Sequence, residues 1–114
     1  MARGGKQQVA AAAKAYQRAT RRLRAHLDEV DEGLVVFVEM MRQGESAAAV
    51  LTGTDASRRR RELADSFDDF EAAKKRLRLC VLRLSQEQGD SVADVARALG
   101  ISRQLAYRLL AEGD

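Results

Sequence analysis

The chain has 114 residues, of which 46% are hydrophobic and 4% aromatic, and it contains no proline. This length fits one small domain, or a compact unit with a helical arm, and the apolar fraction is sufficient for a core. The scarcity of aromatic residues and of proline argues against a turn-rich β fold, whereas abundant alanine and arginine favour helices. The net charge of +3 is by itself weak support for an anionic partner. We therefore expect an all-α fold.

Several classes of function have no support in the sequence. The longest apolar run, residues 34–38, is far shorter than the ~20 residues of a membrane helix. Cys80 is the single cysteine, so no intramolecular disulfide is expected, and its apolar neighbours predict a buried thiol in a cytoplasmic protein. No phosphate loop, nucleophile–base pair or zinc ligand set appears. The lone His26 has no Cys, His or carboxylate partner at ligand spacing. We expect no enzyme activity, no cofactor and no metal.

A first long helix is predicted from about Val9 to Gly44. Apolar or small residues recur there at alternating steps of four and three, as on one face of a helix. Gly33 lies inside this pattern and leaves open whether the helix is kinked or broken there. Gly44 suits the cap that ends it. The residues of this row are Val9, Ala13, Tyr16, Thr20, Leu23, Leu27, Val30, Leu34, Phe37 and Met41.

Charge is distributed unevenly along this first helix. Residues 1–24 carry seven basic side chains and no acidic one, and residues 25–46 carry six acidic and one basic. This asymmetry predicts two surfaces with different partners. The basic part suits DNA backbone or a membrane, or the acidic residues between 65 and 71 on a packed neighbouring helix. We favour the packed neighbour.

A short helix over residues 45–53 and a second long helix ending at Gly89 follow. The second long helix repeats the heptad spacing, and the residues of its row are Leu63, Phe67, Phe70, Lys74, Leu77, Val81 and Leu84. Two helices of similar length with a short connection predict an antiparallel hairpin, or a bundle formed across a dimer. Near the start of the second helix lies a run of four arginines, Arg58, Arg59, Arg60 and Arg61. These are candidate contacts to DNA backbone, or an ordinary solvated helix start.

The C-terminal segment carries the strongest local pattern. Ser91 and Asp94 form a start that is similar to a capping box, with Asp where Glu is usual. Gly100 then separates this helix from a second one, which Ser102 caps. Small Ala96 allows the two helices a close approach, and together they predict a helix-turn-helix. The apolar residues expected inside it are Val92, Val95, Ala96, Leu99, Ala106, Leu109 and Leu110.

This segment resembles bacterial helix-turn-helix DNA-binding proteins, particularly the three-helix type of small transcriptional regulators and recombinase DNA-binding domains. The resemblance is carried by Ala96 in the first helix, Gly100 in the turn, Ile101 after it, and the Ser-Arg-Gln opening at Ser102. It covers roughly residues 75–112, with residues 75–88 as the support helix. Ala106 departs from the larger aliphatic residue usual in the family, which predicts looser packing there.

The resemblance implies that the last helix, residues 102–111, enters the major groove of double-stranded DNA. Arg and Gln side chains bond guanine and adenine in bidentate fashion, and the helix start suits a phosphate. The alternative is a merely solvated helix face, because helix-turn-helix geometry also occurs in proteins that bind no DNA. The predicted DNA-binding residues are Ser102, Arg103, Gln104, Tyr107 and Arg108.

These observations predict two functional regions. Residues 1–70 are expected to be a helical dimerisation or interaction region, and residues 71–114 a DNA-binding unit, with the second long helix shared between them. A single small unit makes few contacts, so we expect a homodimer that regulates transcription at the nucleoid. Two alternatives stay open. One is an architectural, nucleoid-associated or plasmid-maintenance DNA-binding protein, and the other is a helical adaptor that binds RNA polymerase or a sigma-type factor.

Overall fold

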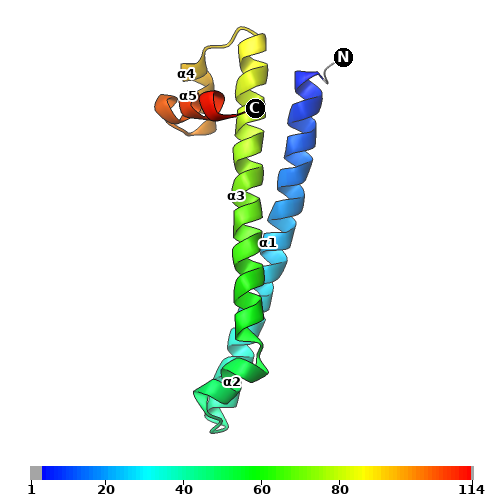
Figure 1. Cartoon of the computed structure of the whole chain (residues 1–114), viewed down its shortest axis with the longest axis vertical. Coiled ribbons are helices and arrows are strands. Elements are labelled where there is room, and N and C mark those ends of the chain that lie inside the picture. Colours follow the sequence, from blue (N-terminus) through cyan, green and yellow to red (C-terminus); the bar gives the residue numbers. More distant parts are fainter. Residues whose placement is uncertain (1–3, 114) are drawn as a thin grey trace. The chain divides into compact units, whose positions relative to one another are not determined.

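The computed structural model describes residues 4–113, and five helices make up most of this range (Figure 1). In chain order they are α1 (Gly5–Arg42), α2 (Ala47–Gly53), α3 (Ala56–Glu87), α4 (Val92–Leu99) and α5 (Arg103–Glu112). No strand occurs in the described residues. The expected all-α class, with two long helices and a C-terminal helix-turn-helix, is confirmed. No helix within residues 4–113 is both long and apolar enough to cross a membrane.

The chain forms two compact units. One contains the described residues up to Gln17 together with the chain from Glu71 onward, and the other spans Arg18–Phe70. Both long helices contribute to both units. The division assigns no function to either unit, so the predicted roles in dimerisation and in DNA binding stay predictions.

In the Arg18–Phe70 unit, α1 and α3 run in opposite directions. Arg22 of α1 pairs with Asp69 of α3 at 2.6 Å. One turn later His26 is hydrogen-bonded to Ser66. The residue numbers of these contacts decrease along α3 as they increase along α1, which confirms the antiparallel hairpin within this unit.

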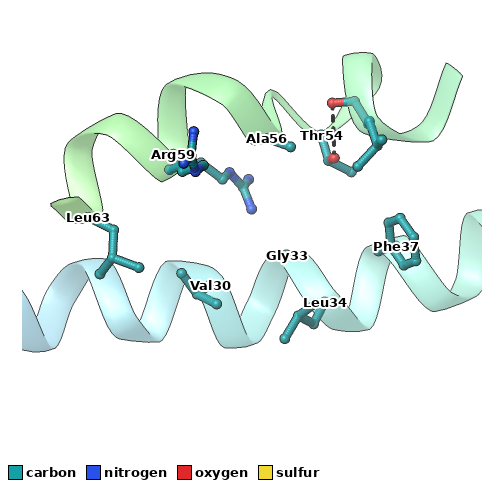
Figure 2. Close-up of a pocket in the computed structure, with 10 residues that line it drawn as sticks. Val30, Gly33, Leu34, Phe37, Thr54, Ala56, Arg59 and Leu63 are labelled. Carbon is teal, nitrogen blue, oxygen red and sulfur yellow. Dashed lines mark hydrogen bonds between the residues drawn. The ribbon is translucent and has the colours of Figure 1, made fainter. Parts of the chain in front are cut away.

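Gly33 does not break α1, which continues to Arg42. A Cβ at this position would overlap the guanidinium of Arg59, which reaches across from α3 (Figure 2). Arg59 Nη1 also donates to the backbone carbonyl of Glu29 at 3.3 Å. Gly33 therefore makes room for an arginine from the opposite helix. Glycine lowers the stability of α1 by about 1 kcal/mol relative to alanine, which is too little to break the helix.

The buried side of α1 departs from the predicted row at three of its ten positions, Leu27, Leu34 and Met41. Val9, Tyr16, Leu23, Val30 and Phe37 are buried or half-buried, as their row predicts. Ala13 and Thr20 are half-buried too, although Ala12 and Ala19 beside them are buried more deeply, and further along the half-buried positions belong to His26 and Gly33. Leu27, Leu34 and Met41 are exposed instead. Gly33 leaves room for the guanidinium of Arg59, and His26 is hydrogen-bonded to Ser66, so apolar size and burial do not coincide on this part of the helix.

In the other unit, the start of α1 lies against the end of α3. A Cβ at Gly5 would contact Leu84 at 2.8 Å, so this end of α1 comes close to α3. Cys80 is 3% exposed, which confirms the predicted buried thiol. Leu79 and Leu82 are buried beside it in sequence, and Leu82 belongs to the core that holds α4 and α5.

Candidate nucleic-acid interface

Three helices meet in the C-terminal unit around one apolar core. Its fully buried members are Leu82 of α3, Ala96 of α4, and Ala106 and Leu109 of α5. Partly buried Val92, Val95, Leu99, Ile101, Leu105 and Leu110 pack around them. All seven apolar residues predicted inside the helix-turn-helix belong to this core, and Leu82 shows that α3 acts as its support helix.

The turn between α4 and α5 is fixed by backbone hydrogen bonds. Ser91 begins α4, and its Oγ accepts from the backbone N–H of Asp94 at 3.1 Å. At the other end Gly100 has a φ of 74°, and the N–H of Ile101 donates to the carbonyl of Ala96 at 3.0 Å. This is a Schellman ending, which needs a left-handed residue and places the following apolar residue against the helix.

The start of α5 is equally well defined. Ser102 is extended, with φ −72° and ψ 151°, and its Oγ accepts from the N–H of Leu105 at 3.0 Å. The helix then spans Arg103–Glu112, so the helix predicted over residues 102–111 is found with Ser102 as its cap. The defined C-terminal end of α4 and the defined start of α5 together set the orientation of α5 against α4.

Ala106 is the position where looser packing was expected. Its side chain is 0% exposed and shares the core with Ala96, which is 1% exposed. Two small alanines therefore lie inside the core where α4 and α5 meet. The burial shows that Ala106 belongs to this core, and looser packing beside it stays a prediction.

The opposite side of α5 is polar and unoccupied by the rest of the chain. Arg103, Gln104, Tyr107 and Arg108 are all exposed. Within the described part of the chain, none of these four side chains makes a hydrogen bond or an ion pair. A rigid helix thus presents two arginines, a glutamine and a tyrosine to solvent.

Residues 72–112 match the family model of the homeodomain-like domain. The match confirms the resemblance to helix-turn-helix DNA-binding proteins for this segment, which the sequence placed at roughly 75–112. Homeodomain-like helix-turn-helix units generally bind DNA rather than catalyse reactions. No curated protein and no solved structure matches the chain.

The homeodomain-like segment contains basic residues that the sequence did not single out. Lys74, Lys75 and Arg78 of α3 line a hollow together with Arg108 of α5. Lys75 also pairs with Glu112 at 3.4 Å, and both side chains are more than half exposed. Nothing local in the sequence links α3 with α5, because their proximity depends on the fold of three helices. On α4, Arg97 lines a second hollow with Arg103.

The arginine run lies in the Arg18–Phe70 unit, outside the homeodomain-like segment. Arg58 donates to Asp55 at 2.6 Å and to Glu62 at 2.8 Å, and these hydrogen bonds raise the pKa of its guanidinium above the ordinary value. Arg61 donates to the hydroxyl of Ser57 at 2.9 Å. With Arg59 engaged at Gly33, Arg60 alone in the run has no hydrogen-bond or ion-pair partner among residues 4–113.

His26 does have carboxylate partners, contrary to the sequence argument. Glu29 lies three residues further along α1, and Glu62 approaches from α3. The spacing of three residues on a helix was a local signal that could have been used. The contribution of Glu62 could not be foreseen, since it depends on the register of the two helices.

Proposed function

We propose that the protein is a sequence-specific DNA-binding transcriptional regulator that acts as a homodimer at the nucleoid, with α5 in the major groove. The observation that carries this proposal is the exposed polar side of α5, which faces away from Ala106 and Leu109. Its side chains have no partner in the described chain, and the helix that holds them is capped at Ser102. Preorganised, unengaged donors are what base recognition requires.

Each residue of this side has a proposed role. Arg103 and Gln104, in the first turn of α5, read base edges, because Arg suits guanine O6 and N7 and Gln suits adenine N6 and N7. Tyr107 and Arg108, one turn later, bind phosphate oxygens. Ser102 keeps its cap bond to Leu105 and donates its hydroxyl proton to a phosphate beside the helix start.

Further backbone contacts are proposed from the support helix. Arg78 extends the positive charge of Arg108 along α3 and suits the phosphates that flank the groove. Lys74 and Lys75 pair with Glu71 and Glu112 in the same hollow, and on binding they exchange these exposed pairs for phosphates. The run from Arg58 to Arg61 stays a candidate for backbone contact, and Arg60 is the member best able to make it, because the others are engaged within the chain.

The homodimer is proposed from an exposed surface of α1, which we call the outer face. It is formed by Leu34, Val35 and Val38 together with Glu39, and Asp31 and Arg42 lie at its two ends. Val35 is 68% exposed and Leu34 is 57% exposed. Contiguous apolar side chains on a surface commonly mark a contact with another protein. One helix-turn-helix makes few DNA contacts, and two of them share the load on a twofold site.

Charge indicates that a second copy suits this face. In an antiparallel pair of α1 helices related by a twofold axis, a residue i that faces residue j of the partner also has its own residue j facing the partner's residue i. The register that places Val35 opposite the partner's Val38 also places Asp31 opposite the partner's Arg42, and this happens twice. The outer face is therefore complementary to itself at Val35 with Val38 and at Asp31 with Arg42, while the same register places Leu34 opposite the partner's Glu39.

A charge swap tests the dimer. Asp31→Arg is expected to shift the protein towards monomer in sedimentation equilibrium, because the new arginine of each copy then faces Arg42 of the other copy and repels it. Adding Arg42→Asp to the same chain restores opposite charges and should restore the dimer. A parent protein that stays monomeric at all concentrations, or a double variant that fails to recover, contradicts the dimer proposal.

Binding of genomic DNA fragments to the purified protein tests the function as a whole. The proposal predicts enrichment of one motif with two half-sites, about 34 Å or a multiple of it apart. Diffuse binding without a motif favours the architectural or plasmid-maintenance alternative. Absence of binding at low salt favours the adaptor that binds RNA polymerase or a sigma-type factor.

A further inference from the structure

Three potential metal ligands from two helices meet in the Arg18–Phe70 unit. His26 and Glu29 lie one turn apart on α1, and Glu62 lies on α3. One ligand atom of each lies within 4.8 Å of the others. The separation of His26 Nε2 and Glu62 Oε2 is 3.9 Å. The cluster therefore joins the two helices of the hairpin.

The histidine ring is held in the orientation that metal binding needs. Its Nδ1 is hydrogen-bonded to Oγ of Ser66, a side chain that is 1% exposed. When Nδ1 carries the proton and donates it to this hydroxyl, Nε2 has a free lone pair directed at the carboxylates. Metal-binding histidines almost always have such a partner on the second nitrogen, which fixes the tautomer. Ser66 therefore orients the His26 ring and selects the tautomer that leaves Nε2 free for a metal ion.

Glu62 is held in a comparable way. Its Oε1 accepts from Arg58 at 2.8 Å, which leaves Oε2 for the side of His26. The His26 side chain is 20% exposed and that of Glu62 is 37% exposed, so an ion has access from solvent. Arg58 lowers the affinity for a cation by its charge, but it also fixes the carboxylate. The two carboxylates together still offset the charge of a divalent ion.

We propose that His26, Glu29 and Glu62 bind one divalent transition-metal ion, with Zn²⁺ as the expected ion. One imidazole nitrogen with two carboxylate oxygens is a donor set that zinc accepts, and water completes the coordination. Zinc–ligand bonds of about 2.0–2.1 Å place ligand atoms about 3.3 Å apart in a tetrahedron. The ligand atoms lie 3.9 Å apart for His26 and Glu62 and within 4.8 Å for the whole cluster, so side-chain rotation of the two glutamates must close the site around the ion. The ion then links α1 to α3, independently of any contact with DNA.

The first test uses the full chain, free of any affinity tag and stripped of metal with a chelator, titrated with zinc chloride. The chain contains one histidine, so its two ring nitrogens are assigned without ambiguity by ¹⁵N NMR. We expect the Nε2 resonance to shift and to saturate at one zinc per chain, while Nδ1 keeps its proton. An unchanged Nε2 resonance, or a shift at Nδ1 instead, overturns the proposal.

Variants then assign the carboxylates by calorimetry. Glu29→Gln and Glu62→Gln are each expected to weaken zinc binding by at least about tenfold, and Ser66→Ala by about 10–100-fold through loss of the second-nitrogen partner. Glu32→Gln is the matched control, because Glu32 is an exposed glutamate on the same helix outside the cluster. Circular dichroism confirms that each variant keeps its helices. Equal affinities in the cluster variants and the control overturn the proposal.

Discussion

The two units of the molecule differ in how many of their large apolar residues they leave exposed. In the helix-turn-helix, leucines such as Leu82 and Leu109 are buried and the polar residues of α5 are exposed. The Arg18–Phe70 unit buries Leu23 and Val50 together with the small Ala19 and Ser66, but it leaves Leu34 and Val35 exposed. The first unit has a satisfied core of its own, and the second leaves apolar surface that another protein can cover.

Because of this difference, we expect the stability of the two units to depend on different features. In the helix-turn-helix, large side chains removed from water and well-made helix caps determine the orientation of α5. In the hairpin, close approach of small residues and polar contacts across the pair set the register, and the outer face is free for association. The predictions below separate the two arrangements.

Truncating a leucine in each unit gives the largest expected contrast. Leu82→Ala should lower the free energy of unfolding by about 2–5 kcal/mol, because it empties part of a closed core. Leu34→Ala should change it by no more than about 0.5 kcal/mol, measured by urea unfolding at concentrations where the protein is monomeric. Similar losses for both variants would mean that the hairpin has a core involving Leu34 and that the contrast is wrong.

Replacing a glycine in each unit gives an intermediate effect of opposite sign. Gly100→Ala should destabilise by about 1–2 kcal/mol, because Gly100 is left-handed at a φ of 74°. Gly33→Ala should stabilise by up to about 1 kcal/mol, since Gly33 is helical and only the end of the Arg59 side chain must move. Urea unfolding of the two variants checks both signs. A destabilising Gly33→Ala would show that the Arg59 contact contributes more than helix propensity.

The smallest expected effects concern contacts to DNA backbone. Lys75→Ala should reduce the slope of log affinity against log salt by about 1, as for one lost phosphate contact. Arg60→Ala should reduce it by less, because Arg60 lies outside the homeodomain-like segment. Fluorescence anisotropy at several salt concentrations measures both slopes. A larger change for Arg60→Ala would move the main backbone contacts to the arginine run.

The features that the sequence predicted best are those with local causes. Ser91, Gly100 and Ser102 act through bonds to residues within a few positions, so their types alone place the ends of α4 and α5. The same reason explains why α5 was predicted within one residue. The exposed side of α5 followed directly, since a fixed helix start determines which residues share a face.

The features that the sequence did not predict depend on which helices meet. Apolar size placed Leu27 and Leu34 in the seam of α1, but α3 meets His26 through Ser66 and Gly33 through Arg59. The grouping of Lys75 with Arg108, and of Glu62 with His26, likewise requires the register of two helices distant in sequence. A spacing of three and four residues predicts the buried side of a helix only to within one residue, because two adjacent positions can each fit the pattern.

The central claim is that the exposed side of α5 reads base sequence, and one measurement tests it most directly. The motif bound by the parent is compared with the motifs bound by Arg103→Ala and Gln104→Ala, using libraries with single base-pair changes. Each variant is predicted to lose about 1–3 kcal/mol of discrimination at one base pair and to keep its preference elsewhere. If both variants discriminate among all sequences as the parent does, α5 does not read DNA, and the account is contradicted.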